Sequence, residues 1–381
     1  MNNFEKSKKL PVGSPDFEKA RSKEQYRLPA LEVKNTVIKR NTAFPELPFK
    51  FEVGKQTPLG IFFTKNSEKY QEKKRRPVIM PEDSTGRSGS FGPVIFKDRE
   101  GRMYRDVDAK GIGYYYKETL EENYVIENTK RDDPLDNGDP RKAPGLMDYE
   151  FALRDMNYSE KFIHAGIRTH RVLGIIDLEE IIVDEEKISV EEARKRGFMN
   201  EEMHPVAEVR AFGTKERIAY LDNRDSEDQE KAIDDARRIV SAELGKDPDQ
   251  FSSEDYLRWF SETLGQQVAK IRKLKLHHGY ISTHNITLDC RIVDLDSVTP
   301  VKEFLADNEN MTEDDIYSQD YFGAKTSLDH LVSDLNLLST KSSADFREKG
   351  ALELFKKAYE EELKTKRSGA KSKPREAQKA A

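Results

Sequence analysis

The sequence predicts an α+β protein built from a strand-rich first lobe and a helical second lobe. Short apolar runs bounded by breakers, the pattern of strands, follow one another between residues 46 and 125. A single helical pattern over residues 147–165 is embedded in this part of the chain and ends at Gly166. From residue 225 onward the apolar residues recur at three- and four-residue steps, which is the period of a helix.

Composition limits the classes of protein to which the chain can belong. Of its 381 residues, 36% are hydrophobic and 36% are charged, with Lys+Arg 65 against Asp+Glu 71 and a net charge of −6. The negative balance argues against a general nucleic-acid binder. No run approaches the ~18–20 apolar residues of a membrane span, and the first residues lack an apolar signal core. We therefore expect a cytoplasmic monomer that binds neither nucleic acid nor membrane. A single cysteine, Cys290, excludes an intramolecular disulfide.

Changes in composition divide the chain into four parts. Residues 1–45 are polar and charged and predict an N-terminal extension, either wrapped on the core or flexible. Residues 46–210 predict the strand-rich N-lobe, and residues 211–363 predict the helical C-lobe. The tail over residues 364–381 is rich in Lys, Ser and Ala, which predicts a disordered basic segment.

The strand predictions rest on alternation and on short apolar runs. They cover residues 49–53, 60–63, 93–96, 171–176 and 205–210. In the first of these, Phe49, Phe51 and Val53 alternate with polar residues. A loop rich in turn formers, residues 132–145, separates the early strands from the embedded helix.

The long helix of the C-lobe has the clearest pattern. Ser252 followed by Asp255 predicts a capped start. The helix has one apolar face made of Leu257, Phe260, Leu264, Val268, Ile271 and Leu274. It is expected to stop at His277-His278-Gly279, and Ile292-Val293 predicts a short strand-like piece beyond it.

Two segments of the N-lobe carry residue types suited to phosphate binding. Gly89 and Gly92 lie in a glycine-rich stretch, and glycine lets backbone N–H groups approach phosphate oxygens. The alternative for this stretch is a surface turn. Lys110 lies in a strand-like segment and would face the side opposite to Val107 and Ala109. It resembles the strand lysine of protein kinases, although a lysine near a strand end is often simply solvated.

Glu160 falls on the apolar stripe of the embedded helix. Tyr149, Leu153, Met156, Glu160 and Ile163 step by four and three residues. Burying a carboxylate on such a stripe is costly unless a cation pairs with it. Lys110 is the natural candidate for that cation; the alternative is a half-buried glutamate at the edge of the stripe.

The segment after the long helix resembles the catalytic loop of kinase-like phosphotransferases. Asn285 lies five residues after Tyr280 (285 − 280 = 5), which is the kinase spacing between base and metal-binding asparagine. Asp294 follows an apolar pair, as the metal-binding aspartate of kinases does. An amide oxygen and a carboxylate suit Mg²⁺ that shares its shell with phosphates. Tyr280, however, stands where kinases have the aspartate that accepts the substrate proton. With the element order, this segment predicts a bilobal, protein-kinase-like fold.

Four blocks between about residues 84 and 298 resemble the selenoprotein O family of protein adenylyltransferases, which are AMPylating pseudokinases. The first is Asp108–Gly113, similar to a Lys-Gly-x-Gly strand, and the second is Ser159–Arg171, similar to the family's helix and turn. Arg210 and Arg217 are seven residues apart (217 − 210 = 7), as are two phosphate-binding arginines of the family. The fourth block, His278–Asn285, resembles a loop that also lacks the kinase aspartate.

The resemblance implies that AMP moves from Mg-ATP to Ser, Thr or Tyr hydroxyls of proteins. It implies ATP and Mg²⁺ as cofactors, with Asn285 and Asp294 holding the metal. Lys110 would bind the phosphates and act in catalysis with Asp294. The remaining nucleotide-binding residues that it implies are Gly89, Gly92, Gly111, Gly113, Glu160, Arg210 and Arg217.

Two departures leave alternatives open. His284 stands where the family has an aspartate proposed as catalytic, so His284 is either a substitute base or a loop residue without a role. Asp296 is either a second metal ligand or an exposed acid. The chain could therefore also be a kinase-like phosphotransferase or a non-catalytic nucleotide-binding scaffold. The family's C-terminal redox residue is missing, since Cys290 lies within the loop.

Overall fold

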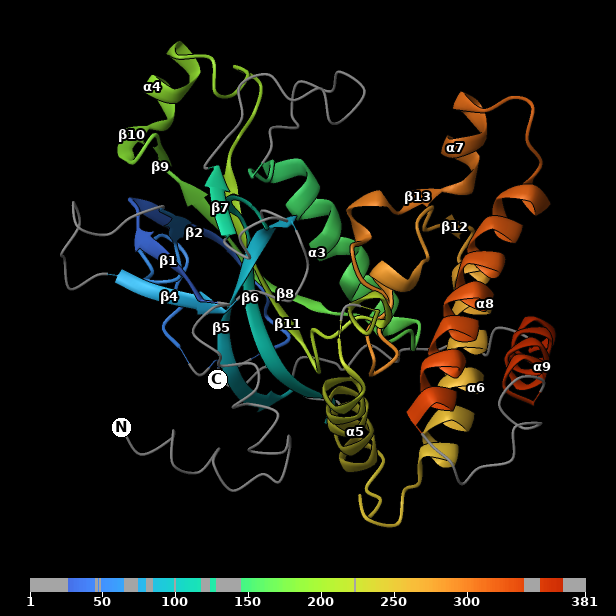
Figure 1. Ribbon diagram of the computed structural model, residues 1–381. Coiled ribbons are helices and arrows are strands. Elements are labelled where there is room, and N and C mark those ends of the chain that lie inside the picture. Colours follow the sequence, from blue (N-terminus) through green and yellow to red (C-terminus); the bar gives the residue numbers. More distant parts are fainter. Residues whose placement is uncertain are drawn as a thin grey trace, which may run out of the picture.

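The computed structural model describes residues 27–44, 47, 49–64, 75–79, 85–98, 101–117, 124–127, 145–222, 224–338 and 350–365. These residues form a strand-rich lobe with one long helix, followed by a lobe of helices (Figure 1). The architecture is the predicted one: α+β and bilobal, with a strand-rich N-lobe and a helical C-lobe.

A large antiparallel sheet makes up most of the N-lobe. Within the described residues its strands are β1 (Arg27–Glu32), β2 (Asn35–Arg40), β3 (Ile61–Phe63), β4 (Arg75–Ile79), β5 (Thr85–Lys97), β6 (Met103–Lys117), β7 (Tyr124–Glu127), β8 (Arg171–Leu178) and β11 (Val206–Phe212). Their order is β2-β8-β11-β6-β5-β4-β1-β3, with β7 paired to β6. A separate ribbon of β9 (Glu180–Val183) and β10 (Glu186–Ser189) leads into the short helix α4 (Val190–Lys195).

The structure differs from two sequence predictions at the start of the chain. Of the two alternatives for residues 1–45, the described part packs on the core, but as an integral part of the N-lobe: β1 and β2 pair into the sheet and bury Leu31 and Val37. Residues 1–26 lie outside the described part. Residues 49–53 form no strand, because Phe51 instead packs as a loop residue against β8, where Gly174 leaves room for its ring.

The middle of the sheet has one apolar face and one polar face. Val107 and Ala109 of β6 and Val209 of β11 belong to the N-lobe core. The residues between them, Asp108 and Lys110 on β6 among them, point to the opposite face because side chains alternate along a strand. This polar face is turned toward the C-lobe, as the contacts of Lys110 with Asp294 and Asp296 show.

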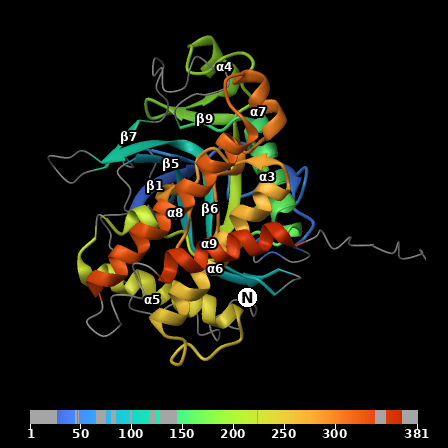
Figure 2. The same ribbon diagram turned by 90° about the vertical axis from the view of Figure 1, so that its right-hand side faces the viewer.

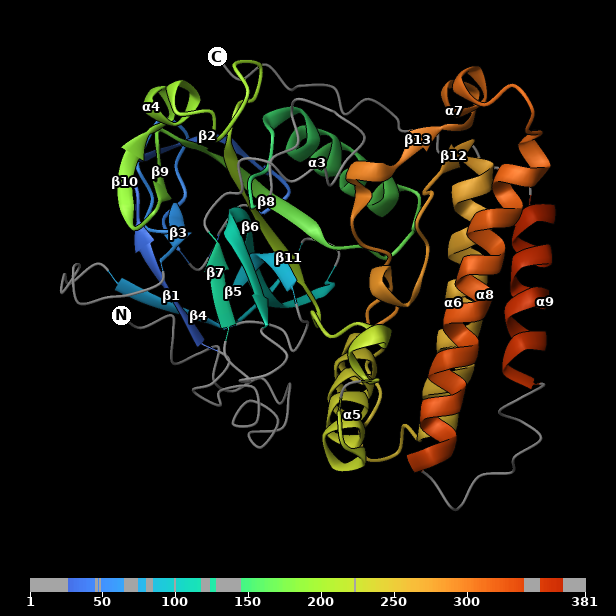
Figure 3. The ribbon, with the colours of Figure 1, turned by 45° about the horizontal axis from the view of Figure 1, so that its top comes forward.

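The embedded helix is α3 (Tyr149–His164), close to the predicted range of 147–165. Asp148 caps its start by accepting a hydrogen bond from the Glu150 amide at 2.9 Å. It ends before Gly166, whose φ of +73° is the left-handed conformation that glycine tolerates best. In Figures 1 and 3, α3 lies between the sheet and the helical lobe.

The C-lobe is built around α6 (Ser253–Lys273), which confirms the predicted long helix. Ser252 and Asp255 form a reciprocal capping box at its start. The other described helices of the C-lobe are α5 (Ser226–Glu243), α7 (Val301–Asp307), α8 (Glu313–Leu338) and α9 (Ala351–Lys364), with α6, α8 and α9 side by side in Figures 2 and 3. The predicted basic tail began at residue 364, but Lys364 is the last residue of α9; the rest of that prediction, from residue 366 on, lies outside the described part. No helix in the described ranges is both long and apolar enough to span a membrane.

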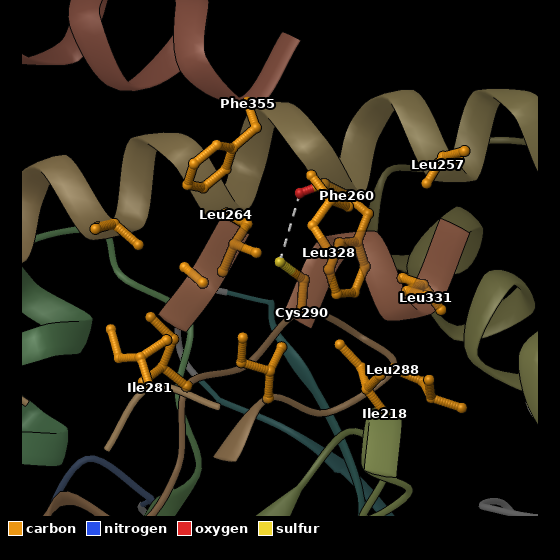
Figure 4. Packing of buried hydrophobic residues seen from close by; sticks show 14 of the residues in the cluster. Ile218, Leu257, Phe260, Leu264, Ile281, Leu288, Cys290, Leu328, Leu331 and Phe355 are labelled. Carbon is orange, nitrogen blue, oxygen red and sulfur yellow. Dashed lines mark hydrogen bonds between the residues drawn. The ribbon is translucent and has the colours of Figure 1, made fainter. Parts of the chain in front are cut away.

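The apolar stripe of α6 forms the C-lobe core as predicted. Phe260 and Leu264 pack with Phe355 of α9 and Leu328 of α8 (Figure 4). The thiol of Cys290 lies in the same core, 3.7 Å from the Phe260 carbonyl oxygen. Burial there raises the pKa of the Cys290 thiol, which makes it an inert core residue.

A fully buried arginine of the C-lobe donates a hydrogen bond to the first residue of β6 in the N-lobe. Arg291 is 1% exposed and its guanidinium donates to the Met103 carbonyl at the start of β6, at 2.7 Å. The same side chain pairs with Asp289 at 2.6 Å and with Glu243 of α5 at 3.0 Å. The first strand residue of β6 is therefore fixed to the C-lobe by buried charge-assisted hydrogen bonds.

Candidate active site between the lobes

An aspartate of α8 anchors the loop that follows α6. Asp320 is 3% exposed and accepts hydrogen bonds from the backbone amides of His278 at 2.8 Å and Gly279 at 3.1 Å. The His278 ring contacts the Val293 carbonyl at 3.0 Å, which joins the loop to the segment that presents Asp294. Asp320 is absent from the sequence predictions, since nothing in its local pattern marks an anchor 42 residues along the chain.

Lys110 reaches from the sheet to the C-lobe. Its Nζ lies 2.8 Å from Asp294 Oδ1 and 3.1 Å from Asp296 Oδ2, and its side chain is 6% exposed. Burial alone would lower the pKa of Lys110, but Asp294 and Asp296 outweigh burial and raise it. The structure therefore brings Lys110 and Asp294, two predicted site residues, into direct contact, and it pairs Asp296 with Lys110.

The predicted pairing of Lys110 with Glu160 is wrong. Glu160 instead accepts from Arg171 at 3.0 and 2.8 Å and from Asn41 at 2.7 Å. Arg171 is 2% exposed and is also held by Asp98 at 2.9 Å. The Glu160 carboxylate on the apolar stripe of α3 is thus paired with a buried cation, as the cost of burying an unpaired charge leads one to expect. That cation lies on the adjacent strand β8, so Glu160 supports the fold of the N-lobe and does not touch Lys110.

Arg210 is fixed on the polar face of β11 by a carboxylate of β6. Asp108 accepts from Arg210 Nε at 3.0 Å and Nη2 at 2.8 Å, and it also pairs with Lys215 at 2.6 Å. Burial would raise the pKa of Asp108, but Arg210 and Lys215 hold it well below its usual range. With two of its nitrogens engaged, Arg210 still places Nη1 3.5 Å from Asp294 Oδ1.

Lys215 is a further cation that the sequence predictions missed. It is 3% exposed and donates from Nζ to the Ser88 hydroxyl of β5 at 3.1 Å. Burial lowers the pKa of Lys215 more than the attraction of Asp108 raises it. Lys215 lies shortly after β11, so the polar residues of that strand were the sequence feature that could have indicated this cation.

Arg217 lies between the two predicted metal ligands. Its Nη1 donates to Asn285 Oδ1 at 3.3 Å, lies 3.9 Å from Asp294 Oδ2, and also bonds the His284 carbonyl. Two hard oxygen donors therefore converge on one cationic nitrogen, a donor set that fits Mg²⁺. Within the described residues no group of three or more His, Cys, Asp or Glu side chains forms a metal site, so a metal here would share its shell with phosphate oxygens or water.

Asp294 is the centre of this constellation. Its backbone adopts the left-handed conformation with φ of +65°, and its side chain is 31% exposed. Burial would raise the pKa of Asp294, but Lys110, Arg217 and Arg210 outweigh burial and hold it well below the usual range. Three basic side chains from separate parts of the chain thus surround one carboxylate.

The predicted glycines have different positions from those expected of a phosphate loop. Gly89 and Gly92 lie within the continuous strand β5, where Gly89 pairs with Ala109, and no loop intervenes. Gly111 and Gly113 have φ of +89° and +104°. A Cβ on Gly111 would lie 2.5 Å from Met147 Cβ, so backbone conformation and close packing explain this glycine.

His284 and Tyr280 lie at the solvent side of the loop. His284 is exposed in the 3₁₀ turn Thr283–Asn285, and the Tyr280 side chain is 69% exposed. The Tyr280 carbonyl accepts from the Asn285 side chain at 2.9 Å, so Tyr280 orients Asn285 through its backbone. The role of His284 as a base stays a prediction, because its imidazole makes no hydrogen bond described in this part of the chain.

Comparisons with known proteins add little to this geometry. No family model and no curated protein matches the sequence, so the resemblance to the selenoprotein O family stays a prediction. Among solved structures, a rhoptry antigen kinase domain of Toxoplasma gondii is similar, with a TM-score of 0.33 and 10% identity over 77% of this chain and 78% of that chain.

Proposed function

We propose that the site around Asp294 binds Mg-ATP and that the protein transfers AMP to hydroxyl side chains of other proteins. The observation that carries this proposal is the gathering of Lys110, Arg210 and Arg217 around Asp294, within 4 Å. Basic side chains that are already held in place around one point suit an anionic ligand such as phosphate. A triphosphate with its metal is the ligand whose charge complements both the cations and the Asn285–Asp294 oxygens.

The arginines suit phosphate better than lysines would. A guanidinium is planar and meets two phosphate oxygens at once, and it stays charged at every accessible pH. Arg210 is preset by Asp108, so little side-chain entropy is lost when it meets a phosphate. Asn285 and Asp294 would hold Mg²⁺, which neutralises charge on the phosphate oxygens when bound.

The missing loop aspartate favours adenylyl transfer over phosphoryl transfer. At the kinase position of that base the chain has Tyr280, whose side chain points to solvent. In adenylyl transfer the acceptor oxygen bonds to the α-phosphorus, the bond from that phosphorus to the bridging oxygen breaks, and pyrophosphate leaves with the electron pair. Lys110, Arg210 and Arg217 would stabilise the charge on pyrophosphate. The hydroxyl proton would pass to His284 or to solvent.

A kinase-like phosphotransferase is the second candidate, favoured by the kinase-like fold and by the contact of Lys110 with Asp294. Asp296 is a weak substitute for the missing base, since it is held by Lys110 and lies 3.6 Å from Arg87. A non-catalytic nucleotide-binding scaffold is the third candidate. It would bind Mg-ATP at the same site without transferring either group.

Labelled ATP distinguishes these functions. The protein is incubated with Mg²⁺, a mixture of soluble proteins, and ATP labelled at either the α- or the γ-phosphate. Adenylyl transfer predicts protein-bound α-label only, lost in Asp294→Asn; γ-label alone would assign a kinase and overturn the proposal. A rise in melting temperature with Mg-ATP, but no bound label, would assign a scaffold.

A further inference from the structure

Two neighbouring cross-strand pairs on the polar face of the sheet behave differently. β6 and β11 pair antiparallel, with Arg210 opposite Asp108 and Glu208 opposite Lys110. Directly opposed residues on one face have Cβ atoms about 5 Å apart, close enough for charged side chains to pair. Arg210 and Asp108 do pair, through two hydrogen bonds. The second pair has opposite charges as well, yet Lys110 leaves it and reaches Asp294 and Asp296 of the C-lobe.

Glu208 is left without a partner in this arrangement. The residue is 0% exposed, and neither of its carboxyl oxygens makes a hydrogen bond. Burial, and after it the nearby Asp155, raises the pKa of Glu208 well above its usual value. Asp155 itself, on α3, is engaged by the His170 ring at 2.7 Å. A buried carboxyl with both oxygens unsatisfied is costly, so a cation that reached it would relieve that cost.

We infer that Glu208 is the second partner of Lys110 and positions its amine in the nucleotide-bound state. This inference rests on the proposed binding of Mg-ATP at Asp294. A metal ion at Asp294 would compete with the Lys110 amine for the same carboxylate, because both are cations. Glu208 lies directly across the strand pair from Lys110 and its oxygens accept no hydrogen bond, so we expect a change of the Lys110 rotamer to bring the amine to it. Lys110 would then be held by the sheet and still face the phosphates.

A comparison of variants without any ligand tests this exchange. Asp294→Asn with Asp296→Asn removes the C-lobe partners of Lys110, which is then expected to turn to Glu208. In that background Glu208→Gln should lower the melting temperature by about 2 °C or more. In the otherwise unchanged protein Glu208→Gln, which keeps the shape of the side chain, should leave the melting temperature nearly unaltered. An equal effect of Glu208→Gln in both backgrounds would overturn the inference.

Binding of Mg-ATP provides a second measurement. Glu208→Gln is expected to raise the Kd for Mg-ATP about tenfold when Lys110 is present and to add nothing in a Lys110→Met background. A purely structural role of Glu208 would weaken binding equally in both. If the unaltered protein fails to bind Mg-ATP, the proposed function falls, and the ligand-free comparison still decides whether Lys110 and Glu208 pair.

Discussion

Replacing Glu160 by Gln is expected to lower the free energy of unfolding by about 2 kcal/mol and to leave Mg-ATP binding unchanged. Arg171, its partner, is 2% exposed, and breaking a buried pair by removing one charge costs about 3–5 kcal/mol. Two features reduce that value here. The Glu160 side chain is 24% exposed, and Asp98 continues to hold Arg171 at 2.9 Å. The amide oxygen of Gln also keeps one of the hydrogen bonds that the carboxylate accepts.

Urea unfolding followed by fluorescence measures this loss, and calorimetric titration measures the affinity for Mg-ATP. Glu254→Gln is the matched control, since Glu254 forms an exposed pair with Arg258 in which both side chains are 46% exposed. Such a pair contributes about 0.3–0.5 kcal/mol. If Glu160→Gln leaves stability intact but weakens Mg-ATP binding as strongly as Lys110→Met does, the reasoning is refuted, because Glu160 would then act on Lys110.

Three more outcomes follow from the structure. Gly111→Ala should lower the free energy of unfolding by about 3 kcal/mol or more in urea, because the new Cβ would lie 2.6 Å from a backbone oxygen. Gly245→Ala is the control: its Cβ would meet open space, and it should cost about 1 kcal/mol. Equal costs for the two variants would contradict this reasoning. Burial, and then Asp222, raises the pKa of Asp334 from 3.8 to about 6, so the folded protein retains a proton that the unfolded chain releases, and stability falls as pH rises between these values. Asp334→Asn should therefore stabilise the protein by about 1–2 kcal/mol at pH 7.5 and change little at pH 3, as melting curves at both pH values would show. Asp320→Ala leaves two loop amides without an acceptor and should cost about 3 kcal/mol in urea unfolding, with faster hydrogen exchange in residues 278–285; unchanged exchange would contradict the anchoring role.

Local patterns predicted the helices and named both residues of the central contact. The capping pair Ser252 and Asp255 and the apolar stripe of the following helix depend only on residues close in sequence, and the structure confirms both. Lys110 and Asp294 were each predicted as nucleotide-site residues, and the structure places the lysine amine 2.8 Å from the carboxylate. What these predictions share is that neither required a choice among competing partners.

The errors arose where such a choice was needed. Periodicity placed Glu160 on a half-buried stripe but could not distinguish Arg171 from Lys110 as its cation. A glycine pattern suited to phosphates is equally suited to positive φ beside a tight packing contact, as at Gly111. Glu208 went unnoticed, although a charged residue inside an otherwise apolar strand segment is itself a signal of a polar face.

The Arg291 contact has a mechanical consequence. Because Arg291 holds Met103 against the C-lobe, a movement of the two lobes apart would rotate about this end of β6. Lys110 lies seven residues further along the strand (110 − 103 = 7), roughly 23 Å away at about 3.3 Å per residue. A hinge rotation of only about 5° would carry the Lys110 amine about 2 Å, enough to break its 2.8 Å contact with Asp294. A small rotation at the Met103 end of β6 therefore produces a large displacement at Lys110.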